Sequence, residues 1–299
     1  MKIKFIVKPP AKKEFERELS KFKEEFEIEK ELTEREGPKC ARNLAKRAIE
    51  EGFNRIIFVG GDGLLSEGIN GIFETTEGRI PPDFAIGTIP TGAGNNFAKG
   101  LGITKDVKKA FEIIRNDKIV SVDLGKVNER YFINCFSIGF DALINRVAND
   151  LKEKYRFLPR NLSYLFAAFK EIIIKIPNFE VEMETKGLNY QGKIILAAIT
   201  NSQSYGAIFK VNPGALISDG SFNLCLIEPV GKIRALFDLY CATRGTHVNL
   251  TEVKTFLFSS PLSVFSSEPI PWETDGEVFE PEKEFKISIL PRAIKFLTL

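Results

Sequence analysis

The stretch that decides the fold runs from residue 55 to residue 72 and reads RIIFVGGDGLLSEGINGI. Its first part, Arg55–Val59, is mostly apolar and predicts a buried β-strand. A Gly-Gly-Asp-Gly turn ends this strand, and Leu65, Ile69 and Ile72 then recur at helical spacing. A strand, a glycine turn and a helix in this order bring backbone N–H groups to a phosphate. Asp62 lies inside the turn, where a nucleotide site that also holds magnesium can use a carboxylate.

The first third of the chain alternates predicted strands and helices. We expect strands at residues 2–7, 26–32, 56–59 and 83–89, with amphipathic helices between them. Such alternation predicts a largely parallel α/β sheet, whose ligands lie at the carboxyl ends of the strands. A second glycine-rich turn, PTGAGNNFA at residues 90–98, also follows a strand. We expect the two turns to converge on one cleft, although each alone could be an ordinary tight turn.

The pattern changes after about residue 118, where short predicted strands follow one another closely. They cover residues 120–127, 131–138, 179–185, 192–201, 221–228 and 255–259, and one helical segment interrupts them from Ala142 to about Lys175. This pattern is typical of an antiparallel sandwich or barrel. The sequence therefore predicts two domains with a boundary near residues 120–128, a largely parallel α/β domain followed by an antiparallel sandwich or barrel. The last strands, in residues 284–299, could close the sandwich or return to the first domain.

The composition excludes several classes of protein. The chain has 299 residues, 43% of them hydrophobic, and its 42 basic and 40 acidic residues leave a net charge of +2. A dedicated nucleic-acid binder would show a strong basic excess, so we expect no nucleic-acid partner. No signal peptide is recognisable, and the apolar runs are far too short to span a bilayer. We therefore expect a cytoplasmic protein without a transmembrane segment.

The cysteines and the single histidine exclude other chemistry. Cys40, Cys135, Cys225 and Cys241 show no paired spacing, which argues against a zinc site or a redox pair and favours free thiols. With His247 as the only histidine, a Ser-His-Asp triad and a multi-histidine metal centre are close to excluded. The polar residues before His247 predict that it lies at the surface.

The motifs together resemble those of the diacylglycerol kinase catalytic domain superfamily, which includes bacterial soluble lipid kinases, sphingosine kinases and ceramide kinases. The first motif is GGDG at residues 60–63 with Glu67 and Asn70, and the second is the turn at residues 89–98. The later motifs are VDLGKV at 122–127, FINC at 132–135 with IGFDA at 138–142, NPGA at 212–215 with SDG at 218–220, and TDGE at 274–277. The resemblance covers nearly the whole chain in the order of the family.

This resemblance implies a Rossmann-like α/β domain over residues 1–122 that binds ATP. It also implies an antiparallel β-sandwich over residues 123–283 that takes a lipid substrate, with the active site between the two domains. Thr33, after the second strand, matches a threonine that contacts the nucleotide. The other implied nucleotide contacts come from the two glycine turns: Gly60, Gly61, Asp62, Gly63, Leu64, Leu65, Ser66, Glu67, Gly92, Ala93, Asn95 and Asn96.

The resemblance also implies a metal site and a catalytic acid in the second domain. Leu216, Asp219 and Ser221 match the positions that hold Mg²⁺, two of them through backbone carbonyls. Glu277 matches the carboxylate that takes the proton of the lipid hydroxyl, with Asp275 beside it. Taken singly, the Asp-Gly pairs at 219 and 275 could be ordinary hairpin turns. Phosphoryl transfer needs positioning, charge neutralisation and a weak base, which carboxylates and a metal can supply.

Three residues depart from the family pattern. Leu64 stands where threonine is usual, as it does in the sphingosine kinase branch, and Ala93 also replaces a threonine. Asn96 stands where many members have an aspartate near the magnesium, so its neutral side chain is expected to weaken metal binding. These departures bear on the acceptor lipid, diacylglycerol-like or sphingosine-like, more than on the kinase activity.

The helical segment offers a way to meet a lipid substrate. Lys152, Lys154, Arg156 and Arg160 precede a run of aromatic and aliphatic residues, a pattern that can dock on an anionic membrane surface. It can equally be a helix packed on the sandwich with solvated lysines at its start. A transient peripheral contact with the membrane is thus one expectation, and a homodimer is another open option.

Two other functions remain compatible with the sequence. An NAD kinase shares the GGDG loop and an α/β plus β arrangement, but it does not usually carry the GNNFA turn together with a late Asp-Gly-Glu. A catalytically silent lipid- or nucleotide-binding protein is suggested by Leu64, Ala93 and Asn96. The leading hypothesis is an ATP- and Mg²⁺-dependent lipid kinase.

Overall fold

The computed structural model describes residues 2–34, 36–37, 39–92, 94–155, 160–204 and 209–299. The chain divides into two compact units. The first unit comprises residues 1–122 and 292–299, and the second comprises residues 123–291. Only the last eight residues return to the first unit, so this return begins at Arg292 and not at residue 284. No helix in the described part of the chain is long and apolar enough to cross a membrane.

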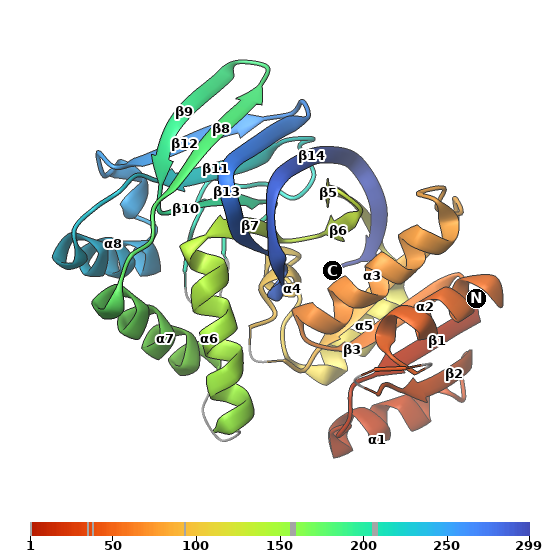
Figure 1. The fold of residues 1–299 in the computed structure, drawn as a ribbon. Coiled ribbons are helices and arrows are strands. Elements are labelled where there is room, and N and C mark those ends of the chain that lie inside the picture. Colours follow the sequence, from red (N-terminus) through yellow and green to blue (C-terminus); the bar gives the residue numbers. More distant parts are fainter. Residues whose placement is uncertain (1, 35, 38, 93, 156–159, 205–208) are drawn as a thin grey trace. The chain divides into compact units, whose positions relative to one another are not determined.

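The first unit is built on a parallel sheet (Figure 1). Its strands are β1 (Lys2–Val7), β2 (Glu27–Leu32), β3 (Arg55–Gly60) and β4 (Ala85–Pro90), in the spatial order β4-β3-β1-β2. The end of β14 (Glu277–Leu297) adds a further parallel partner, with Phe296 opposite Ile86. Strands β3 and β4 are buried along their whole length, as expected for a sheet covered on both faces.

Helices cover both faces of this sheet. They are α1 (Lys13–Phe22), α2 (Ala41–Glu50), α3 (Asp62–Thr76), α4 (Asn96–Gly100) and α5 (Val107–Asn116). Phe5 of β1 packs against Phe15 and Phe22 of α1 and Phe111 of α5. On the other face α3 is so close to β3 that a Cβ on Gly68 would lie 2.1 Å from the ring of Phe58. The alternating α/β pattern predicted for this region is therefore correct.

The second unit is mainly antiparallel. Strands β12 (Val253–Phe258), β11 (Phe222–Ile227), β10 (Leu196–Thr200), β7 (Cys135–Gly139), β13 (Leu262–Thr274) and the start of β14 pair in that order. The hairpin β8 (Phe179–Thr185) and β9 (Leu188–Ile194) pairs with β13, while β5 (Ile119–Val127) pairs with β6 (Arg130–Phe132) and β14. A buried cluster that includes Phe132, Phe136, Trp272 and Phe285 forms the core between these strands.

Three helices cover this unit at one side (Figure 1). The predicted helical segment is two helices, α6 (Phe140–Lys154) and α7 (Arg160–Ile174). A third helix, α8 (Lys232–Arg244), was not predicted, because Ile233, Phe237 and Tyr240 on its exposed side obscure the amphipathic period. A second buried cluster lies beneath the three helices and includes Phe140, Ile144, Tyr164, Ile172 and Phe209.

Two further expectations change. The last strands, expected within residues 284–299, are parts of one long strand, β14, with Arg292 in the left-handed region at φ 51°. The prediction that His247 lies at the surface is wrong: its side chain is 2% exposed, because the short helix at His247–Asn249 turns it inward. The prediction of free thiols is confirmed, since all four cysteines are unpaired and three are buried.

Candidate active site

The two glycine turns of the first unit lie against each other, as the sequence predicts. Thr91 N and Gly92 N both donate to Gly60 O, at 2.8 Å and 3.2 Å. A Cβ on Gly92 would lie 2.6 Å from Cα of Gly61, so a side chain there would push the turns apart. Gly63, in the first turn of α3, has open space where its Cβ would be. The backbone is thus exposed at a helix N-terminus, the arrangement that accepts phosphate groups.

The Asp62 side chain connects the two glycine turns through hydrogen bonds. Its Oδ2 accepts a hydrogen bond from Asn96 N at 2.9 Å, and its Oδ1 accepts one from Phe97 N at 3.3 Å. Both donors lie at the start of α4, whose first N–H groups have no partner within the helix. The carboxylate therefore joins the first turn to the second. These two hydrogen bonds give the acid inside the GGDG turn a structural role that does not require a metal.

The second turn contains acceptors that lack partners. Asn95 Nδ2 donates to Gly92 O at 2.8 Å, which fixes the amide, and Asn95 is in the left-handed region at φ 52°. The Oδ1 atoms of Asn95 and Asn96 are buried and have no hydrogen-bond partner among the described residues. Buried acceptors of this kind are normally satisfied, so they fit a ligand that supplies donors or a cation. Ala93, the remaining expected contact of this turn, lies outside the described residues.

The other expected nucleotide residues have different environments. Leu64 and Leu65 are buried, and Leu64 lies against Gly60, so only their backbone atoms can serve a nucleotide. Ser66 is also buried, and its carbonyl accepts from Asn70 Nδ2 at 2.9 Å. Thr33 is buried after β2, where its N–H donates to Val7 O at 2.9 Å.

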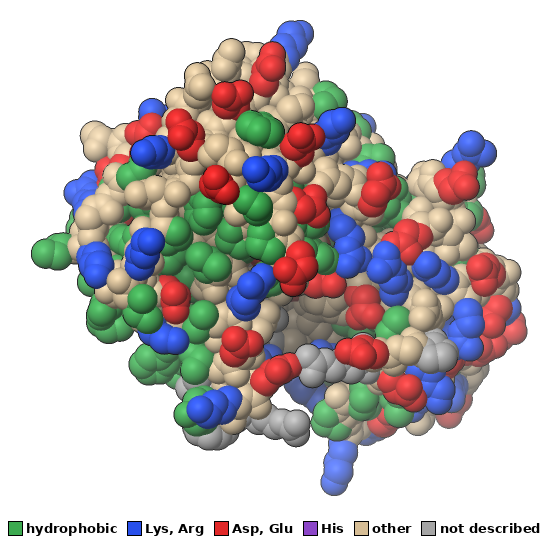
Figure 2. Space-filling view, viewed as in Figure 1, with side chains coloured by type: hydrophobic (Ala, Val, Ile, Leu, Met, Phe, Trp, Pro, Cys, Tyr) green, Lys and Arg blue, Asp and Glu red, His purple; other side chains and the backbone are tan. Residues whose placement is uncertain are grey.

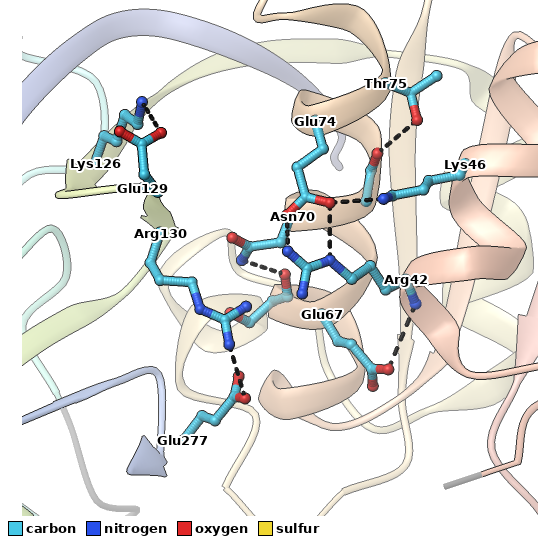
Figure 3. Close-up of polar contacts among 12 residues, drawn as sticks. Arg42, Lys46, Glu67, Asn70, Glu74, Thr75, Lys126, Glu129, Arg130 and Glu277 are labelled. Carbon is cyan, nitrogen blue, oxygen red and sulfur yellow. Dashed lines mark hydrogen bonds and ion pairs between the residues drawn. The ribbon is translucent and has the colours of Figure 1, made fainter. Parts of the chain in front are cut away.

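Glu67 links α3 to α2. Its Oε1 accepts a long hydrogen bond from Arg42 N at 3.5 Å (Figure 3). About two turns further along α3, the Glu74 carboxylate accepts a hydrogen bond from Arg42 Nε at 2.9 Å and pairs with Lys46 Nζ at 2.8 Å. These contacts hold α3, the helix that begins at the GGDG turn, against α2. In this structure the Glu67 side chain therefore interacts with the neighbouring helix α2.

In the second unit the Asp-Gly-Glu motif forms a two-residue hairpin. Thr274, the last residue of β13, pairs with Glu277, the first of β14, and Asp275 and Gly276 both have positive φ. These are the angles of a type I′ turn, which fits the twist of antiparallel strands. The hairpin interpretation of this Asp-Gly pair is therefore correct for the backbone.

The side chains of this hairpin differ sharply. The Asp275 carboxylate accepts hydrogen bonds from the N–H groups of Ile133, Asn134 and Cys135, all at 2.9 Å. The Glu277 side chain is 59% exposed and meets Arg130 at 3.3 Å (Figure 3). The Asp275 carboxylate thus fixes the backbone of residues 133–135 at the start of β7. The Glu277 carboxylate, in contrast, is accessible to solvent.

A buried polar network that the sequence does not predict lies next to this hairpin. Glu273 is fully buried and accepts from Gly276 N at 2.8 Å and from Asn145 Nδ2 at 2.8 Å. Ser137 Oγ lies 3.0 Å from Glu273 Oε1 and 2.7 Å from Asp141 Oδ2. Tyr164 of α7 donates its hydroxyl to the same Asp141 carboxyl. The available signal was the sequence IGFDA, whose aspartate follows directly after a buried strand.

This acidic network affects the neighbouring thiol. Burial, together with the carboxyl groups of Glu273, Asp141 and Asp275, raises the pKa of Cys135 well above its ordinary value. The thiol is therefore neutral and is not a nucleophile.

The expected metal loop is anchored by another aspartate. Asp219 Oδ1 accepts from Ser221 N at 3.0 Å, which closes a local turn, while Leu216 is exposed. The fully buried Asp123 holds the loop, because its N–H donates to Ile217 O and its Oδ2 accepts from Gly220 N at 2.7 Å. In the described part of the chain no three acidic, histidine or cysteine side chains converge on a common metal position. A magnesium ion here would rest on one carboxylate, backbone carbonyls and water, which suits its habit of keeping several waters.

An apolar cavity of about 110 Å³ lies in the second unit beneath α6, α7 and α8. Its walls are aliphatic and aromatic, with Ile144, Ile172, Ile195, Phe209 and Leu239 among the residues that line it. The Asp141 and Tyr164 pair borders it, which connects the cavity to the network behind the Asp-Gly-Glu hairpin. Asp238 and His247 contribute further polar groups to its lining. Apolar walls with a few placed polar groups are characteristic of small-molecule sites.

Comparisons with known proteins agree with this arrangement. The model of the diacylglycerol kinase catalytic domain matches residues 2–127. A second model, described as the YegS C-terminal NAD kinase beta sandwich-like domain, matches residues 134–298. The prediction of an α/β domain followed by a β-sandwich is thereby confirmed.

Curated relatives match most of the chain. A diacylglycerol kinase of Staphylococcus carnosus is 31% identical over 233 residues, covering 78% of this chain and 73% of that protein. A diacylglycerol kinase of Bacillus subtilis is 29% identical over 281 residues, covering 92% of this chain and 89% of that protein.

Solved structures show the same fold. A crystal structure of a diacylglycerol kinase from Bacillus anthracis covers this chain completely, with a TM-score of 0.79 and 20% identity over 97% of that chain. An NAD kinase from Archaeoglobus fulgidus in complex with ATP also covers it completely, with a TM-score of 0.58 and 13% identity over 94% of that chain. The fold is therefore shared by kinases with quite different acceptors, and the acceptor must be argued from the site.

Proposed function

The chain belongs to the diacylglycerol kinase catalytic domain family, and we propose that it transfers the γ-phosphate of ATP to the hydroxyl of a lipid with Mg²⁺ as cofactor. Membership of this family makes it a phosphotransferase that acts on an alcohol group. The observation that carries the lipid acceptor is the apolar cavity bordered by Asp141. An acyl chain suits its walls, whereas the polar dinucleotide of an NAD kinase does not.

The described residues suggest how the reaction is supported. The paired glycine turns offer backbone N–H groups and the buried amide oxygens of Asn95 and Asn96 to the nucleotide. Bound Mg²⁺ would neutralise phosphate charge, and Asp219 with the carbonyls near Leu216 and Ser221 are its proposed ligands. Glu277 is the proposed base, because its exposed carboxylate can accept the proton of the lipid hydroxyl. Asp275 and Asp62 then act as positioning residues through their hydrogen bonds to the backbone.

The activity can be tested with labelled ATP and a panel of acceptors: diacylglycerol, sphingosine, ceramide, undecaprenol and NAD. We expect the label in a lipid product, and its loss when Mg²⁺ is chelated. Transfer to NAD alone would overturn the lipid assignment. Nucleotide binding without transfer to any acceptor would favour a catalytically silent protein.

Glu277→Gln tests the proposed base. The amide keeps the size of the side chain but cannot take a proton, so we expect kcat to fall by about 10²- to 10⁴-fold. The affinity for ATP, measured by calorimetry, should not change. Glu129→Gln is the matched control, because Glu129 is 93% exposed and pairs with Lys126 (Figure 3). Full activity in Glu277→Gln would show that another group accepts the proton.

We also propose that the second unit contacts the membrane surface through α7 and α8. Phe166, Phe169 and Ile174 of α7 and Ile233 of α8 are between 49% and 88% exposed. Figure 2 shows hydrophobic side chains gathered over these helices at the left of the view. Basic side chains accompany them, with Lys170 58% exposed and Lys232 at the start of α8. Apolar side chains flanked by cations are suited to an anionic bilayer.

Some expected basic residues cannot be placed on this surface. Lys152 and Lys154 lie at the end of α6, whereas Arg156 and the side chain of Arg160 lie outside the described residues. The proposed setting is the cytoplasm, with transient contact at the membrane where the lipid resides. A homodimer stays a prediction that a measured mass in solution would test.

A further inference from the structure

The lining of the apolar cavity contains two polar groups, Asp238 and His247, that the reaction does not use. Asp238 is 5% exposed, and neither of its carboxyl oxygens has a hydrogen-bond partner among the described residues. His247 is 2% exposed, and its Nδ1 also has no such partner. Buried polar atoms are rarely left unsatisfied, because the loss of hydration is costly. Two unsatisfied groups in one cavity therefore point to a ligand.

The contacts of His247 determine which kind of hydrogen bond Nδ1 can make. Its Nε2 lies 3.0 Å from the carbonyl oxygen of Val211, which can only accept. Nε2 therefore carries the proton. Burial lowers the pKa of His247, which keeps the ring neutral. In a neutral imidazole with the proton on Nε2, Nδ1 is an acceptor.

Asp238 is also an acceptor. Arg234 Nε lies 3.2 Å from its Oδ1 but approaches at an angle unsuited to a hydrogen bond, and Arg234 is shared with Glu252 at 2.5 Å. Burial, together with the adjacent carboxyl group of Glu252, raises the pKa of Asp238 to about 6, so the group is mainly ionised at neutral pH. The Arg234 guanidinium lies beside both Asp238 and Glu252. Because most of the remaining lining is apolar, a neutral hydroxyl carried on a hydrocarbon chain suits this part of the cavity as the donor.

The Asp141 side of the cavity differs in this respect. The Asp141 carboxylate accepts hydrogen bonds from Ser137 Oγ at 2.7 Å and from the hydroxyl of Tyr164. The acceptors that lack donors thus belong to α8 and to the short helix that carries His247, and not to the group next to the Asp-Gly-Glu hairpin.

We propose that the cavity selects an acceptor lipid whose hydrocarbon chain carries a second hydroxyl, which donates a hydrogen bond to Asp238 or to Nδ1 of His247. This inference rests on the proposed lipid kinase activity and names the class of its substrate. An unsubstituted chain would leave both acceptors buried and unpaired. A site built for a hydroxyl discriminates strongly against an analogue that lacks it.

The test uses diacylglycerols in which one hydroxyl is moved stepwise along an octadecanoyl chain, compared with the unsubstituted parent. We expect at least one isomer to exceed the parent by about tenfold in kcat/KM, the effect of one hydrogen bond to a buried acceptor. The same isomer should raise the melting temperature of the protein more than the parent does when ATP is absent.

Three variants identify the groups responsible. His247→Leu removes the Nδ1 acceptor together with the Nε2 contact to Val211 O, and Asp238→Leu removes the carboxylate. We expect the preference for the best isomer to fall severalfold in either variant. Leu239→Ala, on the same helix, keeps both acceptors and should change the rates of both lipids alike.

The outcomes separate this inference from the proposed function. If no lipid is phosphorylated, the lipid kinase assignment fails. If the parent and every hydroxylated isomer are phosphorylated at equal rates, the kinase stands and the inference is overturned. In that case the two acceptors are satisfied by water.

Discussion

At the scale of single residues, the structure separates side chains that build the site from those that can react. Asp62 and Asp275 each occur in a Gly-Asp or Asp-Gly motif typical of phosphate or metal sites. Both carboxylates nevertheless accept hydrogen bonds from backbone N–H groups of another segment of their own unit. Glu277 has an exposed carboxylate instead. The motifs therefore mix positioning residues with reactive ones.

Asp275→Ala is expected to be strongly destabilising. The substitution leaves the N–H groups of Ile133, Asn134 and Cys135 without their acceptor in a buried place. We expect the free energy of unfolding to fall by roughly 2–4 kcal/mol, measured by denaturant titration.

Glu277→Ala, two residues away, is the control for this experiment. Its exposed ion pair with Arg130 should contribute less than about 1 kcal/mol. Equal stability losses in the two variants would contradict the structural role given to Asp275.

At the scale of elements, the helix that begins at the GGDG turn depends on close contact with its neighbour. A Cβ on Gly71 of α3 would lie 2.3 Å from the carbonyl oxygen of Arg42 on α2. Gly71→Ala therefore has to separate the two helices, and we expect a loss of about 1–3 kcal/mol in stability by thermal unfolding.

Gly63→Ala provides the comparison within the same helix. A Cβ there has open space, and alanine favours helix by about 0.5–1 kcal/mol over glycine. We expect its stability to be unchanged or slightly higher. A destabilised Gly63→Ala with an unaffected Gly71→Ala would contradict the helix packing described here.

Helix α8 should make the stability depend on pH. Burial raises the pKa of Asp238 to about 6, above its usual value of 3.8, whereas the Arg234 guanidinium lowers the pKa of Glu252 to about 2. For Asp238 the folded state holds its proton more tightly than the unfolded state. Its stabilising contribution is thus present below about pH 4 and is lost as the pH rises through about 6. Glu252 has the opposite sign, but its contribution is lost only as the pH falls from about 4 toward 2.

Asp238→Asn removes the titration of Asp238 and its contact with the Glu252 carboxyl. We expect the stability of the variant, relative to the parent protein, to increase between about pH 4 and about pH 7 by roughly 2 kcal/mol. Melting temperatures measured across this range test it. A difference that does not vary with pH would mean that Asp238 titrates normally in the folded protein.

At the scale of the whole molecule, the proposed function requires contact with a lipid. No helix in the described part of the chain is long and apolar enough to cross a membrane, so we propose that the contact is made at the membrane surface. Phe166 and Phe169 are 59% and 49% exposed on α7. Replacing both with serine should weaken binding to vesicles that contain anionic lipid by about tenfold or more, since each ring contributes about 1.5–3 kcal/mol when buried. Sedimentation with vesicles measures this directly.

Phe265→Ser is the matched control for the membrane surface. Phe265 is 44% exposed but lies on β13, outside α7 and α8. We expect its vesicle binding to match that of the parent protein. Unchanged binding in the double α7 variant would show that another surface meets the lipid.

The sequence by itself determined the order of elements in the α/β unit, because strong apolar periodicity and two glycine turns act over a few residues. It also determined the family, because its motifs recur in order. Only the tertiary structure decided the environment of individual side chains. Asp62, Asp275 and His247 each take their role from segments distant in sequence, at 96–97, 133–135 and 211. Helix α8 forms one wall of the cavity, and the sequence does not predict it. Its apolar residues are divided between the cavity and the exposed surface, so they show no clear helical period. Local periodicity records whether a residue is apolar, but only the packing of the chain decides what that residue faces.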